Sequence, residues 1–139
     1  MSEKNFWTLI RNNLPLKMYR VENRVAQGMP DVHYIGNGNS GWIELKYINK
    51  WPKRRFVSGL RLNQAMWANT YISHGGNSWI LIRVDRDFTV LVSGIHARKL
   101  FDRPSKKHLI EMSSWSKRGN LSTEDWESLA KTISLSRTE

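Results

Sequence analysis

The sequence predicts an α/β fold in which a mixed β-sheet of about five strands is flanked by helices. Apolar residues recur at helical spacing over residues 3–13 and again in the helix expected over residues 60–74. Two alternating runs, at 30–35 and 42–48, are separated by turn residues, which indicates a pair of strands. The helix at 60–74 is followed by an apolar run at 78–84, and this order favours a crossover that makes part of the sheet parallel.

The first half of the chain starts with a helix at residues 3–13, for which Ser2 is a suitable N-terminal cap. The segment Gly36–Gly41 is rich in glycine, asparagine and serine, so it predicts a tight turn. The strands of this half are expected at residues 17–22, 30–35 and 42–48.

The second half continues with the helix at 60–74, which Gly75 and Gly76 should end, with Leu62, Ala65, Met66 and Trp67 facing inward. Residues 102–121 give no clear pattern. The remaining elements are strands at 78–84 and 88–92, a short helix at 95–101 and a last helix capped at Ser122. The whole chain, 1–139, is expected to be one domain, with a core at about 1–92 and a C-terminal helical extension at about 93–139.

Composition limits the classes of function. The net charge is +10, and no aspartate or glutamate occurs between Leu45 and Val84. Cysteine is absent, which excludes disulfides and thiolate metal sites. We find no signal-peptide pattern and no apolar run long enough to cross a membrane, so we expect a soluble, cytoplasmic protein of a bacterial or phage-infected cell. The basic balance favours an anionic polymer as partner, and nucleic acid explains it better than a membrane.

The candidate site combines Pro30-Asp31 with the sequence Glu44-Leu45-Lys46 on the next expected strand. Residues two apart in a strand share a face, so Glu44 and Lys46 lie side by side. A hairpin centred on Gly38 and Asn39 places Asp31 opposite Lys46, on that same face. The alternative is an ordinary surface hairpin that carries a Glu–Lys pair.

This set of residues suits the hydrolysis of a phosphodiester. Asp31 and Glu44 are candidate ligands for Mg²⁺ or Mn²⁺, and the Leu45 carbonyl is a candidate third ligand. A bound divalent ion lowers the pKa of its water and offsets the charge of the phosphate. Lys46 would orient or deprotonate the attacking water, or stabilise the transition state.

The chain resembles the PD-(D/E)xK nuclease superfamily, and within it the small phage and archaeal nucleases of the Holliday-junction-resolvase and VRR-NUC type. The resemblance covers about residues 1–92 and implies a restriction-endonuclease-like core, Mg²⁺ or Mn²⁺ dependence, cleavage of DNA and a homodimer. It also implies that Asp31, Glu44 and Lys46 form the catalytic core and that Gln64 reaches the site from the following helix. The matching segments are Arg20-Val21-Glu22-Asn23, Gly28-Met29-Pro30-Asp31-Val32, Gly41-Trp42-Ile43-Glu44-Leu45-Lys46 and the residue Gln64.

Relatives in that superfamily often carry a further acid before the Pro-Asp motif, and two residues are candidates here. We prefer Glu22, which ends the expected strand at 17–22; the alternative for it is a carboxylate paired with Arg20 or Arg24. Glu3 is interpreted as a carboxylate that the helix N-terminus favours electrostatically.

A basic loop follows the Glu-x-Lys strand and interleaves cations with aromatic residues. Cations of this kind follow a phosphate backbone, and aromatic rings can stack on bases. Trp51 either anchors the loop in the core or stacks on an unpaired base. The expected DNA-binding residues are Lys50, Trp51, Lys53, Arg54, Arg55 and Arg61.

Three functions therefore remain open from the sequence. The first is a metal-dependent DNA endonuclease, whose candidate substrates include branched DNA such as a Holliday junction. The second is a site-specific homing or restriction-like endonuclease. The third is a non-catalytic DNA-binding module on a nuclease fold, against which the complete set of Asp31, Glu44 and Lys46 argues. Cleavage assays on plasmid, junction, flap and single-stranded DNA, with and without Mg²⁺, distinguish the three.

Overall fold

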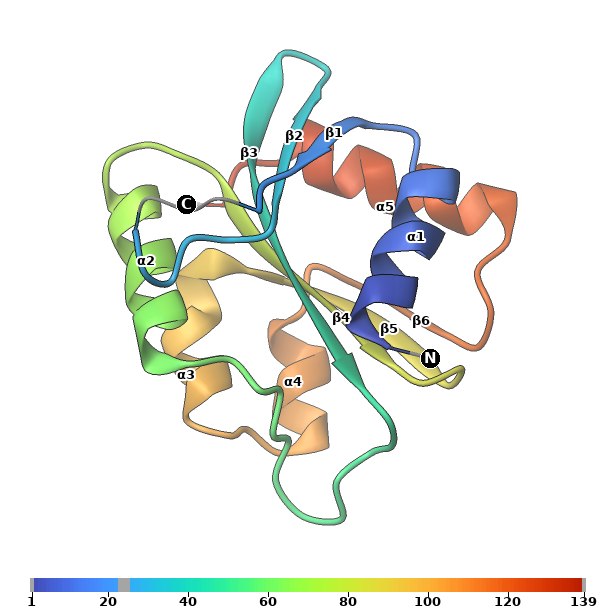
Figure 1. The fold of residues 1–139 in the computed structure, drawn as a ribbon. Helices are drawn as coiled ribbons and strands as arrows, with labels where there is room; N and C mark the ends of the chain where they lie inside the picture. The colour runs from blue at the N-terminus through green and yellow to red at the C-terminus, as the bar shows by residue number, and fades with distance from the viewer. Residues whose placement is uncertain (1, 23–25, 139) are drawn as a thin grey trace.

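The computed structural model describes residues 2–22 and 26–138. Its centre is a six-stranded sheet in the order β1-β2-β3-β4-β5-β6, with helices on both faces (Figure 1). The strands are β1 (Lys17–Arg20), β2 (Val32–Gly36), β3 (Asn39–Ile48), β4 (Ser78–Val84), β5 (Phe88–Ser93) and β6 (Trp115–Arg118). The helices are α1 (Glu3–Asn13), α2 (Leu62–Ser73), α3 (Ala97–Phe101), α4 (Lys106–Met112) and α5 (Thr123–Leu135), and a 3₁₀ turn, Gly94–His96, precedes α3.

The sheet is mixed, which confirms the predicted fold class. β3 and β4 run parallel and are joined through α2, whereas every other neighbouring pair is antiparallel. The sheet has one strand more than the approximately five predicted, because β6 lies in the stretch 102–121 that gave no pattern. Only four residues long, β6 alternates too little to be recognised, and its pairing with β5 at the sheet edge decides its conformation.

The two faces of the sheet bury two separate apolar clusters. Alternate residues of β3, among them Ile43 and Leu45, pack with α1 and α5. The opposite face packs with α2, α3 and α4, and Ile48 contributes to it from β3. Every residue of β4 is buried, as expected for a central strand covered on both sides. Glu44 and Lys46 therefore point toward the α2 side, as the alternation predicts.

The β2–β3 hairpin differs from the predicted register. Its turn is Asn37-Gly38, with φ of 48° and 79°, and Gly36 pairs with Asn39. Positive φ at both central residues matches the two-residue turn that Asn-Gly prefers, so the hairpin is centred one residue earlier than predicted. Continued by one residue, this register brings Asp31 opposite Glu44 instead of Lys46. The shift is two residues along the partner strand, so the shared face is kept.

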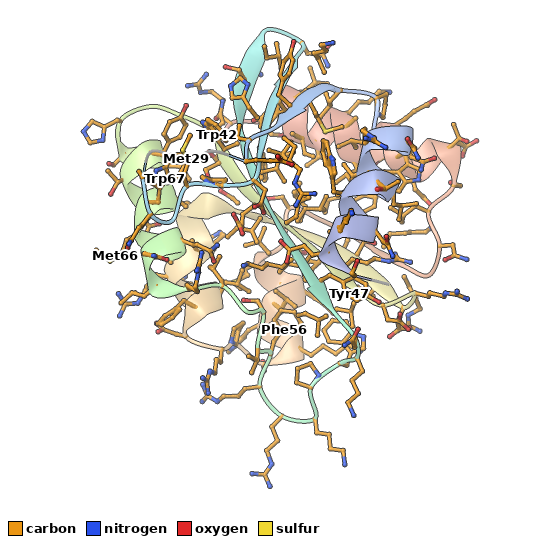
Figure 2. All side chains as sticks on the ribbon, viewed as in Figure 1. Met29, Trp42, Tyr47, Phe56, Met66 and Trp67 are labelled. Atoms are coloured by element: carbon orange, nitrogen blue, oxygen red, sulfur yellow. The ribbon has the colours of Figure 1, made fainter. Side chains whose placement is uncertain are left out.

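The buried face of α2 also differs from the prediction. Ala65 is buried as expected, but Leu62 is 41% exposed and Met66 is 57% exposed. Small residues such as Ala68 let the helix approach its neighbours closely, and this rotates Met66 outward, as Figure 2 shows. Trp67 instead meets Trp42 of β3 edge to face, with the ring centroids 6.0 Å apart.

The residues after position 93 belong to the same sheet and the same apolar clusters as the first half. α5 has the predicted cap, in which Ser122 Oγ accepts from the Asp125 N–H at 3.1 Å. Its residues Leu129 and Ile133 are fully buried in the cluster that α1 covers, whereas Leu135 at its end is 61% exposed. Near the end of the chain, Thr138 Oγ1 accepts from the N–H of Ser78 at 3.1 Å. None of the described helices has the length and apolar character needed to cross a membrane.

Gly28 fixes the loop before Asp31 against the start of α2, and this contact can be tested. A Cβ at Gly28 would lie 2.3 Å from the Asn63 carbonyl oxygen, and its φ is +81°. Gly38 has nearly the same φ, +79°, but open space around the Cβ position, so it isolates the conformational cost. We expect Gly38→Ala to lower the free energy of unfolding by about 1 kcal/mol and Gly28→Ala by about 2–4 kcal/mol, measured by urea unfolding. Equal losses would mean that the loop does not need the close contact with Asn63.

Candidate metal centre

The candidate site lies where the sheet opens. The pairing between β2 and β3 extends to Val32 and Ile43, and beyond it the edge of β3 is taken over by a side chain. The N–H of Leu45 donates to Asp31 Oδ2 at 3.1 Å. In a strand, the N–H and C=O of one residue point to the same side, so the Leu45 carbonyl also faces this open edge. Asp31 is held there because its own carbonyl accepts from the Val21 N–H at 2.8 Å.

Three carboxylates converge at this edge. Glu3, Asp31 and Glu44 each offer an oxygen, and these oxygens lie within 4.8 Å of one another. Asp31 and Glu44 are only 5% and 4% exposed, whereas Glu3 is exposed at the first turn of α1. The group joins a helix, a loop and a strand that are distant in sequence. Its donors are all hard oxygens, which is the chemistry that Mg²⁺ and Mn²⁺ prefer.

Within the described part of the chain, the hydrogen bonds of Glu44 involve only one of its two carboxylate oxygens. Its Oε2 accepts from Gln64 Nε2 at 3.0 Å and lies 3.3 Å from Lys46 Nζ. Its Oε1 is buried and has no hydrogen-bond partner among the described residues. Burial, and after it the charge of Asp31, raises the pKa of Glu44 to about 8, although Lys46 opposes both effects. A hard divalent cation would satisfy the bare oxygen and offset the repulsion between the two carboxylates, so the residues fit such an ion.

Gln64 connects the start of α2 to the site. Its Oε1 accepts from the backbone N–H of Arg61 at 2.9 Å, while its Nε2 donates to Glu44. One side chain thus caps the helix and holds one oxygen of the carboxylate. Because Oε2 of Glu44 is fixed in this way, Oε1 is left to face another ligand. Gln64 is buried, so this arrangement is shielded from water.

The structure brings together Asp31, Glu44, Lys46 and Gln64, which the sequence placed in the site, and adds Glu3 to them. Glu22 is exposed and lies outside the group of three carboxylates. Asn23, quoted with it in the motif, lies outside the described residues. The sequence indicated the position of Glu3 only weakly, through an acid directly after the cap of a helix expected to pack on the sheet. That pattern is also what a helix N-terminus favours by itself.

The basic loop between β3 and α2 projects from the lower end of the sheet in Figure 1. Its cations Lys50, Lys53, Arg54 and Arg55 are exposed, and so is Arg61 at the start of α2.

Trp51, by contrast, packs against the protein. Its ring centroid lies 5.6 Å from that of Phe56 and 5.4 Å from that of Phe88. Its Nε1 donates to Asp87 Oδ2 at 2.7 Å, and Lys106 Nζ lies over the ring at 4.3 Å. These contacts anchor the loop. Lys106 covers one face of the indole ring, so a base cannot stack on that face.

Comparisons with known proteins give a distant likeness. No family model matches the sequence. No curated protein matches it either. Among solved structures, the chain is similar to Hjc of Archaeoglobus fulgidus, described as a Holliday junction resolvase from an archaeal hyperthermophile. The TM-score is 0.48 at 14% identity, over 67% of this chain and 74% of that chain. At this level of similarity the likeness does not establish a function for this chain.

The raised pKa of Glu44 gives the metal-free protein a definite pH dependence. The folded state keeps a proton on Glu44 up to a pH of about 8, whereas in the unfolded chain the carboxyl has its ordinary pKa of 4.5. The folded state therefore binds more protons between these values, and stability falls as the pH rises through them. Glu44→Gln removes this penalty, so in EDTA the variant should gain on the order of 4 kcal/mol relative to the parent between pH 4 and pH 8.

Urea unfolding at several pH values measures this gain, and the values at pH 4 serve as the internal control. Mg²⁺ at pH 8 should stabilise the parent protein but not Glu44→Gln, because a ligand that binds only the folded state raises its stability. A difference between the two proteins that stays constant with pH would contradict the burial of a titrating Glu44.

Proposed function

We propose that this chain is a metal-dependent DNA endonuclease that hydrolyses phosphodiester bonds. The observation that carries the proposal is the buried, unpartnered Oε1 of Glu44 within a group of three convergent carboxylates. Two buried carboxyl groups side by side are costly to keep, because burial and the charge of Asp31 both disfavour the ionised form of Glu44. A protein whose only need was stability would gain from replacing either acid, which favours a functional reason for keeping both.

Three acids would hold the ion in this proposal. Asp31 and Glu44 are the ligands that the sequence suggested, and Glu3 takes the place expected for Glu22 because it lies in the group. The Leu45 carbonyl faces the same edge and is a further donor. A bound Mg²⁺ or Mn²⁺ supplies charge neutralisation at the scissile phosphate and a water of lowered pKa.

The side chains around the acids have separate roles. Lys46 is 13% exposed, so its charge acts in a medium that water screens poorly. Its Nζ is held 3.3 Å from Glu44 Oε2, where it can orient an attacking water or stabilise charge on the phosphate. Gln64 does not need to touch the substrate, since it fixes Glu44 through the 3.0 Å hydrogen bond. We therefore regard Gln64 as a positioning residue.

DNA is the proposed substrate because of charge and its placement. The chain carries a net charge of +10, and the exposed cations Lys50, Lys53 and Arg54 follow β3 directly after the site. Branched DNA and a specific duplex sequence are both open as targets, and a homodimer is the expected assembly. Plasmid, four-way junction, flap and single-stranded DNA, each assayed with and without Mg²⁺, would separate these targets, and sedimentation would report the oligomeric state.

The choice between Glu3 and Glu22 gives a matched pair of variants. Both changes replace a carboxylate with an amide, but only Glu3 lies in the group of three. Glu3→Gln should lower cleavage by about 100-fold and raise the Mg²⁺ concentration needed, whereas Glu22→Gln should behave as the parent does. Asp31→Asn should abolish cleavage while DNA binding persists. Undiminished cleavage in excess EDTA would refute the metal requirement, and full activity of Glu3→Gln would remove Glu3 from the site.

Lys46 should act in the chemical step and not in holding the ion. Lys46→Ala should lower the single-turnover rate by about 100-fold at saturating protein, since a positioned charge or proton donor is lost. The Mg²⁺ dependence should change little, because Lys46 is not a ligand. Lys50→Ala is the matched control: it should weaken DNA binding but leave the rate at saturation unchanged. A near-normal rate in Lys46→Ala would exclude Lys46 from the chemistry.

A further inference from the structure

Two adjoining cavities lie between the basic loop and the α3–α4 region. The first, about 450 Å³, is lined by the backbone stretch 57–60 and by the end of α3, including Phe101. The second, about 650 Å³, is lined by Arg55 and Lys99, by residues 102–105, and by His108, Glu111 and Met112 of α4. Asp102 and Arg103 line both cavities. We refer to these two cavities, which share wall residues, as the α3–α4 groove.

Backbone pairing holds the walls of this groove together. Arg55 forms an isolated antiparallel bridge with Ser105, and the N–H of Phe56 donates to the Pro104 carbonyl at 2.7 Å. The Arg55 guanidinium donates to the Arg103 carbonyl at 3.2 Å. Leu60 and Leu100 lie beneath the walls in the apolar cluster. The groove is therefore a fixed part of the fold, built from segments about fifty residues apart.

The groove carries positive charges that no acidic side chain of the described residues neutralises through an ion pair. Among the described residues, Arg55, Lys99 and Arg103 form no ion pair, although all three are exposed. The acids at the rim are engaged elsewhere. Asp102 pairs with Arg98 at 3.6 Å, and Glu111 pairs with Lys107 at 3.9 Å. Three uncompensated cations around one concave surface attract an anion that can offer several charges in succession.

We propose that the α3–α4 groove binds unpaired nucleotides of a DNA strand, an inference that rests on the proposed nuclease function. A cavity of about 650 Å³ can take in a nucleotide unit but is far too small for the width of a duplex. Arg55, Lys99 and Arg103 would contact phosphates. Phe101 is half-buried in the first cavity, where the Arg98 guanidinium lies 5.8 Å from the centroid of its ring, so a base that stacks there would share the ring with this cation. Cations together with an aromatic surface are the features that single-stranded nucleic acid recognises.

The groove also leads toward the metal centre. Its wall at Val57–Leu60 continues directly into Arg61 at the start of α2. The N–H of Arg61 donates to Gln64, which in turn holds Glu44. In this proposal, the strand that is cut at the carboxylates passes the exposed Arg61 and continues into the groove. The expected consequence is a preference for DNA in which an unpaired segment adjoins the bond that is cut.

The test compares two ligands with the full-length protein in EDTA, so that no cleavage occurs. Fluorescence anisotropy measures the affinity for a blunt duplex and for the same duplex with an unpaired tail. The double variant Lys99→Gln, Arg103→Gln should bind the tailed duplex about tenfold more weakly, with little change for the blunt duplex. The matched control is Arg118→Gln, which removes an exposed cation of β6 that lines neither cavity. Equal loss on both ligands, or no loss, would overturn the proposal.

A second measurement reports stacking and does not depend on charge. A 2-aminopurine in the unpaired tail should lose fluorescence when the parent protein binds, and Phe101→Leu should restore it; unchanged fluorescence with the parent would overturn the stacking role.

The tests also separate the groove proposal from the nuclease proposal. A tail preference in a protein that cuts no DNA with Mg²⁺ would leave the groove in place and remove the nuclease function. Cleavage without tail preference would do the opposite.

Discussion

The packing of several elements of this protein centres on a buried carboxylate, Glu44. The rest of the described chain provides hydrogen-bond or ion-pair partners for only one of its two oxygens. Gln64 and Lys46 engage one of its oxygens, while the other is buried without a partner among the described residues. With Asp31 beside it, burial and like charge raise the pKa of Glu44 to about 8. Nothing in ordinary packing favours such a pair, since a stable core would hold apolar residues there. The neighbouring elements meet at Glu44: β2 begins directly after Asp31, α2 begins near Gln64, and α1 begins at Glu3.

The opening of the sheet is what makes the site possible. Where β2 separates from β3, the Leu45 N–H loses its strand partner and binds the Asp31 side chain instead. A complete ladder would occupy that edge and leave no room for a ligand. The opening is anchored on both sides, because Gly28 lies against the backbone of Asn63 and the Asp31 carbonyl accepts from Val21. Backbone groups thus help to fix the position of Asp31 relative to Glu44.

Contacts with the rest of the protein also hold the basic loop between β3 and α2 in place. Trp51 fixes the loop through Asp87 and two phenylalanine rings, so the cations around it are exposed without being loosely attached. The bridge between Arg55 and Ser105 then sets the loop against the α3–α4 region. Positioned cations lose less conformational entropy on binding phosphates than cations on a flexible tail. The positive charge seen in the composition becomes a defined surface only through these contacts.

The sequence by itself determined the fold class and the local part of the site. Asp31, Glu44 and Lys46 lie in one hairpin, and because the period of a strand is two, even a hairpin predicted one residue late kept Asp31 on the face of Glu44. Tertiary structure decided what depends on distant segments. It added Glu3 to the acids, formed β6 against β5, and turned Met66 of α2 outward. Local sequence patterns do not predict these three features, because each depends on contacts with a segment that is distant in the sequence. Those contacts form only when the helices pack on both faces of the sheet.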